Sequence, residues 1–143
     1  MEIYDSLLGA VCDEYDRVTL IKKSERGEVT LIRHRASGNR YIFRHFSGSS
    51  EVYRKLLTVS CPNLPQIMEV GEKEGKTALL EEYVQGDTLG EILQGGLLTA
   101  AQAKQITRQL CMALWVLHSL GVVHRDVKPD NVIIRGNEAV LID

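Results

Sequence analysis

The chain has 143 residues, 44% of them hydrophobic and 25% charged, which is the balance of a folded domain rather than of a disordered segment. Its formal net charge of -2 offers no excess of cations, so we expect neither nucleic acid nor a membrane surface as a partner. Three widely separated cysteines, an acidic N-terminus unlike a signal peptide and the lack of any run of roughly 20 apolar residues favour a cytoplasmic protein that does not span a membrane.

The first part of the chain predicts a short helix followed by strands. Residues 1–14 place leucines and a valine at helical spacing, so they predict a leading helix. Segments rich in β-branched and aromatic residues follow, and glycine-containing turns separate them. They predict an antiparallel meander of three strands, at 18–21, 29–32 and 41–43.

A second helix and two more strands complete the predicted sheet region. Residues 51–57 carry apolar side chains at helical spacing and follow serines that suit an N-cap. Residues 67–70 and 77–83 predict strands on either side of a polar turn. The expected fold class is therefore α+β, with a five-stranded antiparallel sheet and one helix ahead of a helical region.

A long helix is predicted after a glycine-rich link at 85–96. Thr99 followed by Gln102 forms a capping box, and the helix that it opens should run to about Leu120. Its second half, 110–117, is apolar on every face, which indicates burial on every side. The few residues that follow cannot surround it, so we expect packing partners from outside these residues.

The most informative stretch runs from His124 to Asn131 and reads His-Arg-Asp-Val-Lys-Pro-Asp-Asn. It brings a carboxylate (Asp126), a cation (Lys128) and an amide (Asn131) into one short loop. Such residues often only cap a helix or solvate a turn, but this order is far more specific. It resembles the catalytic loop of the protein kinase family, and the lysine after the aspartate resembles the serine/threonine branch.

The resemblance implies a protein kinase-like fold and activity. A leading extension would occupy 1–14, an N-lobe with its hinge 15–84, and a partial helical C-lobe 85–143, which ends in two short strands at 132–134 and 139–142. The implied reaction transfers the γ-phosphoryl group of ATP to a serine or threonine hydroxyl of a protein substrate, with ATP and Mg²⁺ as cofactors.

The same resemblance assigns roles within the loop. Asp126 would orient or deprotonate the acceptor hydroxyl, Lys128 would steady the phosphoryl oxygens, and Asn131 would coordinate magnesium. Asp143 stands where kinases place the first residue of Asp-Phe-Gly, so it is the second expected magnesium ligand. Because the sequence stops at that residue, we expect the chain by itself to lack activity.

Residues upstream of the loop follow the order that the family shows. The carbonyl of Glu82 and the backbone of Val84 would meet the adenine edge, with Asp87 near the ribose and Glu81 as gatekeeper. The expected cofactor-binding residues are Gly27, Val29, Ile42, Arg44, Glu51, Glu82, Val84, Asp87 and Ile133.

Two elements depart from the family's pattern. Of the three glycines expected in the phosphate-covering loop only Gly27 is present, because Lys22 and Ser24 occupy the other positions and should stiffen the loop. Arg44 replaces the phosphate-anchoring lysine of the third strand. Arginine keeps the charge and should still pair with Glu51, but its planar fork places that charge differently.

Two other functions stay open. Ile42 in place of a small alanine, together with Arg44 and the lost glycines, is compatible with a pseudokinase-like binding or regulatory module. A small-molecule phosphotransferase of related fold shares the His-x-Asp pattern and a downstream asparagine, although Lys128 and Pro129 favour a protein kinase. A partner chain that covers the apolar segment 110–117 is a further expectation.

Overall fold

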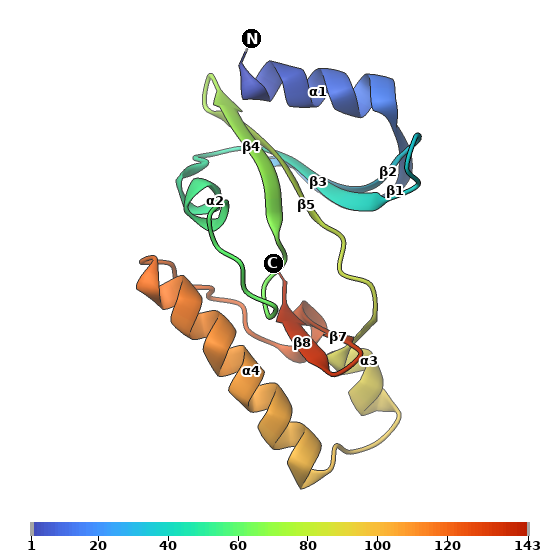
Figure 1. Cartoon of the computed structure of the whole chain (residues 1–143), viewed down its shortest axis with the longest axis vertical. Helices are drawn as coiled ribbons and strands as arrows, with labels where there is room; N and C mark the ends of the chain where they lie inside the picture. Colours follow the sequence, from blue (N-terminus) through green and yellow to red (C-terminus); the bar gives the residue numbers. More distant parts are fainter. Residues whose placement is uncertain (1, 143) are drawn as a thin grey trace. The chain divides into compact units, whose positions relative to one another are not determined.

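A computed structural model describes residues 2–142 of the chain, which form two compact units (Figure 1). The first unit runs to Val59 and includes Gln66–Tyr83, and the second joins Ser60–Pro65 to the chain from Val84 onward. Within the described residues no helix is both long and apolar enough to cross a membrane.

The first unit contains the five-stranded antiparallel sheet that the sequence predicts. Its strands lie in the order β1-β2-β3-β5-β4. A two-residue turn joins β4 to β5, and Glu74 (φ 51°) and Gly75 (φ 77°) both adopt the left-handed conformation that suits tight antiparallel hairpins. The strands are β1 Tyr15–Ser24, β2 Gly27–His34, β3 Arg40–Ser47, β4 Ile67–Lys73 and β5 Lys76–Glu82.

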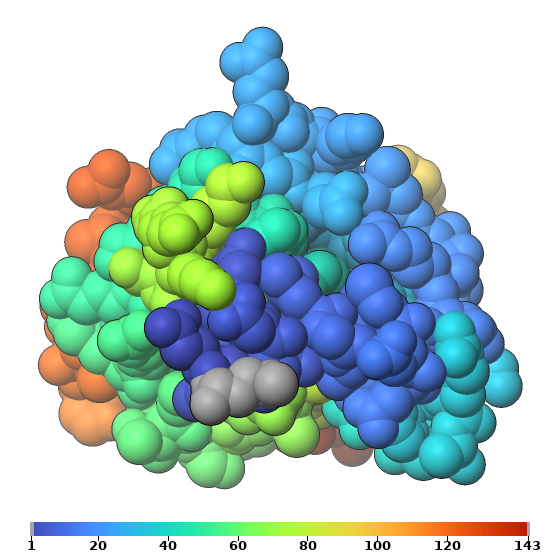
Figure 2. Space-filling view, turned by 90° about the horizontal axis from the view of Figure 1, so that it is seen from above, coloured from blue at the N-terminus to red at the C-terminus, as the bar shows by residue number. Residues whose placement is uncertain are grey.

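Helix α1 (Ile3–Glu14) covers one face of this sheet and confirms the predicted leading helix. Figure 2 shows its atoms lying against the β4–β5 hairpin. The contact is close, because a Cβ atom added to Gly71 would lie 2.6 Å from the Cα of Tyr4 and would overlap its backbone nitrogen. The buried cluster that joins helix and sheet consists of Tyr4, Leu7, Val11, Ile32, Phe43, Ala78 and Leu80.

Polar contacts also hold α1 to the sheet. The hydroxyl of Tyr4 lies 2.7 Å from Nε2 of His45, and Nζ of Lys73 lies 2.9 Å from the carboxylate of Asp5. Burial, together with the charge of Lys76, lowers the pKa of His45, so the ring is neutral at pH 7. A neutral imidazole has one acceptor nitrogen, which suits the Tyr4 hydroxyl as donor.

Helix α2 (Glu51–Leu56) lies on the opposite face of the sheet from α1 (Figure 1). Its half-buried Tyr53 and Leu56 pack against a buried cluster of Ile67, Val70 and Leu79. Each face of the sheet therefore packs an apolar cluster against a helix, while β1 stays exposed along most of its length.

The second unit is built on the long helix α4 (Ala100–Ser119). Its predicted capping box is confirmed, since the amide of Gln102 donates to the Thr99 hydroxyl at 3.1 Å and the Gln102 side chain accepts from the Thr99 amide at 3.0 Å. A three-stranded sheet in the order β6-β7-β8 completes the unit. Its strands are β6 Asp87–Thr88, β7 Val132–Arg135 and β8 Glu138–Leu141.

The prediction of a glycine-rich link at 85–96 is wrong, because helix α3 (Leu89–Gln94) forms within it. A second capping box starts this helix, with Glu91 and Thr88 exchanging hydrogen bonds of 3.1 Å. Threonine followed three residues later by glutamate is a visible sequence signal, but the surrounding glycines and the shortness of the helix masked it.

The apolar half of α4 is only partly buried in the described residues. Ala113 and Leu117 are buried, whereas Met112 and Trp115 are 50% and 67% exposed. Only one stripe of this half is buried, so the expected burial on every side is not seen within the described residues. The expectation that a partner chain covers the rest stays a prediction.

We predict that Gly71→Ala destabilises the first unit by about 2 kcal/mol, because the added methyl group overlaps backbone atoms of Tyr4 and forces α1 away from the sheet. Thermal unfolding followed by circular dichroism measures this. Gly9→Ala is the matched control, since its Cβ meets nothing within 4 Å and alanine favours the helix. Unchanged stability in Gly71→Ala would contradict the close docking of α1.

Candidate functional site

His124 connects the loop 124–131 to the end of β8. Its Nε2 lies 3.0 Å from the carbonyl oxygen of Ile142, and its Nδ1 lies 3.1 Å from the backbone nitrogen of Asp126. A carbonyl oxygen only accepts and an amide N–H only donates, so Nε2 carries the proton and Nδ1 accepts. The ring thereby sets where the backbone of Asp126 lies.

Asn131 holds Asp126 from the other side of the loop. It ends the 3₁₀ turn Pro129–Asn131 and is only 7% exposed. Its Nδ2 donates to the carbonyl oxygen of Asp126 at 2.9 Å and to the Oδ2 of the same residue at 3.0 Å. Both amide hydrogens are used, which leaves the Oδ1 atom of Asn131 as an oxygen ligand for a cation.

The structure brings the three predicted catalytic residues together. Nζ of Lys128 lies 3.8 Å from Oδ2 of Asp126, and both side chains are more than half exposed. The carboxylate of Asp126 thus lies between a cation and an amide while staying open to solvent. Arg125 has a φ of 70°, an uncommon conformation for a residue other than glycine and one that is frequent at functional loops. The expected magnesium ligand Asp143 lies outside the described residues.

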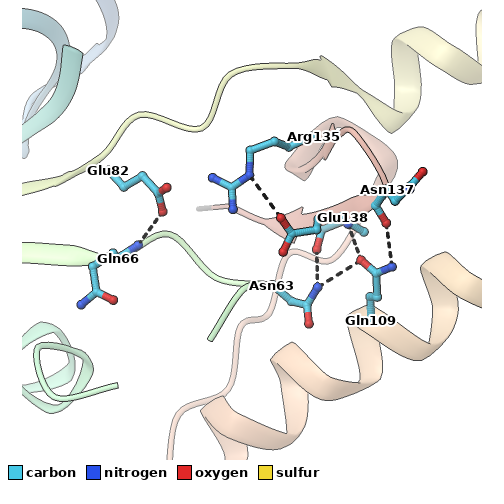
Figure 3. Close-up of polar contacts among 8 residues, drawn as sticks. Asn63, Gln66, Glu82, Gln109, Arg135, Asn137 and Glu138 are labelled. Atoms are coloured by element: carbon cyan, nitrogen blue, oxygen red, sulfur yellow. Dashed lines mark hydrogen bonds and ion pairs between the residues drawn. The ribbon is translucent and has the colours of Figure 1, made fainter. Parts of the chain in front are cut away.

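A network of side-chain amides, buried at Asn63, holds the β7–β8 hairpin, which begins directly after Asn131 (Figure 3). Nδ2 of Asn63 donates to Gln109 at 3.1 Å and to the carbonyl of Ala139 at 2.9 Å. Gln109, on α4, donates in turn to the carbonyl of Asn137 at 2.9 Å. The hairpin is therefore fixed to α4. Asn131 directly precedes this anchored hairpin.

In the first unit, the pairing of strands places several predicted nucleotide-binding residues on one face. Val29 lies opposite Arg44, and Ile42 lies opposite Glu81. Directly opposed residues share a face of an antiparallel sheet, and residues two positions apart along a strand do so as well. Val29, Ile42, Arg44 and Glu81 therefore lie together on the face of the sheet that α2 also covers.

The close packing of β2 against β3 explains the glycine at position 27 without any bound nucleotide. It starts β2 opposite Phe46, and a Cβ atom on it would lie 2.6 Å from the Cβ of Phe46 and would overlap the His45 carbonyl. The close approach of β2 and β3 therefore excludes any larger residue. A cavity of about 250 Å³ lies beside this turn, and charged side chains from Lys23, Arg26 and other residues line it.

The expected pair between Arg44 and Glu51 is not the one that the structure forms. Arg44 donates through Nε to the carboxylate of Glu81, and these side chains are only 17% and 8% exposed. Glu51 is 74% exposed and lies 3.7 Å from Lys55, one turn along α2. Sequence reasoning missed the pair because a partner on a neighbouring strand is visible only once the strand register is known.

The remaining predicted residues are divided between the units. Glu82 ends β5 in the first unit, where its carboxylate accepts from the backbone of Gln66 at 3.1 Å (Figure 3). In the second unit, Val84 is buried, Asp87 is exposed at the start of β6, and Ile133 is half-buried on β7.

Residues 16–143 match the protein kinase domain. The chain belongs to the protein kinase family. The match begins after α1, so this helix lies outside the family's common region.

Relatives of this kinase chain are serine/threonine kinases. It is 35% identical over 94 residues to serine/threonine-protein kinase pkn2 of Myxococcus xanthus. This match covers 63% of the chain and 11% of that protein. It is 30% identical over 134 residues to serine/threonine-protein kinase DCLK3 of Mus musculus. This match covers 87% of the chain and 17% of that protein. The chain therefore spans a small part of these curated relatives.

Solved structures confirm the fold. The crystal structure of Rad53 1–466 in complex with AMP-PNP matches with a TM-score of 0.76 at 21% identity, over 93% of this chain and 38% of that one. The predicted α+β, protein kinase-like fold is thus confirmed.

We predict that Asn131→Ala loosens the loop 124–131 and destabilises the second unit by about 2 kcal/mol, because it removes two hydrogen bonds to Asp126 and leaves a cavity at a buried site. Hydrogen–deuterium exchange of the loop amides measures the loosening. Asn137→Ala is the control, since its side chain is exposed and its carbonyl bond to Gln109 is kept. Equal exchange in both variants would contradict the role of Asn131 as a support.

Proposed function

We propose that the chain provides the nucleotide-binding and catalytic-loop residues of a serine/threonine protein kinase that transfers the γ-phosphoryl group of ATP to a protein hydroxyl. The observation that carries this is the arrangement of Asp126, whose solvent-facing carboxylate is held by the Asn131 amide with Lys128 3.8 Å away. In this proposal residues 15–84 are the N-lobe with its hinge and residues 85–143 are part of the C-lobe, in a cytoplasmic protein.

The roles follow from the chemistry of each group. The carboxylate of Asp126 would accept the proton of the substrate hydroxyl, and the ammonium of Lys128 would stabilise the phosphoryl oxygens. The Oδ1 atom of Asn131 fits Mg²⁺, because magnesium prefers oxygen ligands and both hydrogens of this amide are already used. Asp143 would be the second ligand. Bound magnesium would neutralise charge on the ATP phosphates.

The sheet of the first unit offers the surface for the nucleotide. Val29 and Ile42 would pack on the adenine ring, and Arg44 on the same face would approach the phosphates. The carbonyl of Glu82 and the backbone of Val84 would meet the adenine edge, with Asp87 and Ile133 as further contacts. That a structural neighbour was crystallised with AMP-PNP supports a nucleotide as ligand.

A titration with ATP tests this proposal. Saturating ATP with Mg²⁺ should raise the thermal midpoint, and a ligand at 100 times its dissociation constant contributes about 2.7 kcal/mol. Removing the metal with EDTA should weaken the effect, because the phosphates then lose their counter-charge. Ile42→Asp, which buries a charge where adenine should pack, should abolish the shift, whereas Glu69→Gln, an exposed substitution on β4, should retain it.

The lack of any shift with ATP in the wild type would contradict a kinase and favour a pseudokinase-like binding module. The replaced loop glycines favour that second candidate. A small-molecule phosphotransferase stays the third, and phosphorylation of an aminoglycoside or choline in place of a protein would identify it.

We further predict that the 143-residue chain alone transfers no phosphate to protein, because it spans only 38% of the similar kinase structure. Incubation with radiolabelled ATP, Mg²⁺ and a mixture of serine- and threonine-containing proteins measures this. Robust labelling that Asp126→Asn abolishes would overturn this prediction and would at the same time support the assigned role of Asp126.

A further inference from the structure

The ion pair between Arg44 and Glu81 lies within the sheet itself. Arg44 is opposite Leu79 in the register of β3 and β5, and Glu81 is opposite Ile42. The pair is therefore a diagonal one between neighbouring strands, with both side chains on the same face. Nε of Arg44 donates directly to Oε1 of Glu81.

Burial makes this pair a strong constraint on the arginine. The two side chains are 17% and 8% exposed, so each charge has lost most of its water. A guanidinium stays protonated in any protein environment and needs a counter-charge when it is buried. The carboxylate of Glu81 supplies that charge from a rigid strand, so it sets the direction in which the guanidinium points.

Glu51, the glutamate of helix α2, does not supply a counter-charge to Arg44 in the structure. Glu51 is 74% exposed, and its carboxylate lies 3.7 Å from Lys55 on the same helix. The carboxylate that pairs with Arg44 thus comes from β5 and not from Glu51 of α2.

We propose that Glu81 is the positioning residue that holds Arg44 toward the phosphates of a bound nucleotide, in the place where kinases commonly use a glutamate from the helix. The inference rests on the proposed nucleotide binding. It predicts that the contribution of the phosphates to affinity depends on Glu81 and not on Glu51, since only the former contacts the cation.

Titration calorimetry with two ligands tests the proposal. Adenosine lacks phosphates, so the ratio of the affinities for Mg·ATP and adenosine isolates the part that Arg44 contributes. Glu81→Gln should lower the Mg·ATP affinity about 10-fold, and change the adenosine affinity less than about twofold, because the charged hydrogen bond to Arg44 is weakened. Glu51→Gln should leave the ratio unchanged. Glu69→Gln, with its exposed side chain on the α1 face, is the matched control.

Each outcome has a clear meaning. An equal loss for both ligands in Glu81→Gln would show a merely structural role and overturn the inference. A lower ratio of Mg·ATP to adenosine affinity in Glu51→Gln but not in Glu81→Gln would overturn the inference and leave the proposed function intact. Failure of wild-type chain to bind either ligand would overturn both. If Glu81→Gln does not fold, Glu81→Asp replaces it, and its shorter reach should lower the ratio by a smaller factor.

Discussion

The antiparallel register between β3 and β5 is the constraint on which the first unit depends. Because side chains alternate between the faces of a strand, this register sends Phe43 and Leu80 to the core beneath α1 and sends Arg44 and Glu81 to the opposite face. A shift by one residue would exchange the two sets, burying the charges under α1 and exposing the aromatic core. The apolar packing of α1 therefore also secures the placement of the ion pair.

The loop 124–131 depends on a different kind of constraint. Hydrogen bonds from His124 and Asn131 set the path of its backbone. Both residues also contact Ile142, His124 through its ring and Asn131 through its backbone carbonyl. The loop is thus fixed at the end of β8, which the amide network around Gln109 holds to α4. This leaves the carboxylate of Asp126 exposed on a hydrogen-bonded loop, which is the arrangement that its proposed role requires.

Packing accounts for some of the features that this chain shares with the common kinase pattern and for some that depart from it. Gly27 is required by the close approach of two strands, so its presence says little about phosphate binding. The exchange of lysine for Arg44 goes together with a carboxylate at Glu81, which makes the two positions a matched pair. Helix α1, which lies outside the family's common region, covers a face of the sheet that would otherwise expose apolar side chains.

Local patterns were sufficient to predict most helices and strands and to recognise the protein kinase family. Strand alternation, capping residues and turn glycines depend on neighbours in the chain, so they can be recognised without a structure. The motif from His124 to Asn131 lies within eight residues and can be recognised in the same way. The short helix α3 was missed although its capping box was present. The partner of Arg44 was decided only by the tertiary structure. Glu51 and Glu81 are both carboxylates on elements near β3, and only the strand register and the outward direction of Glu51 select between them.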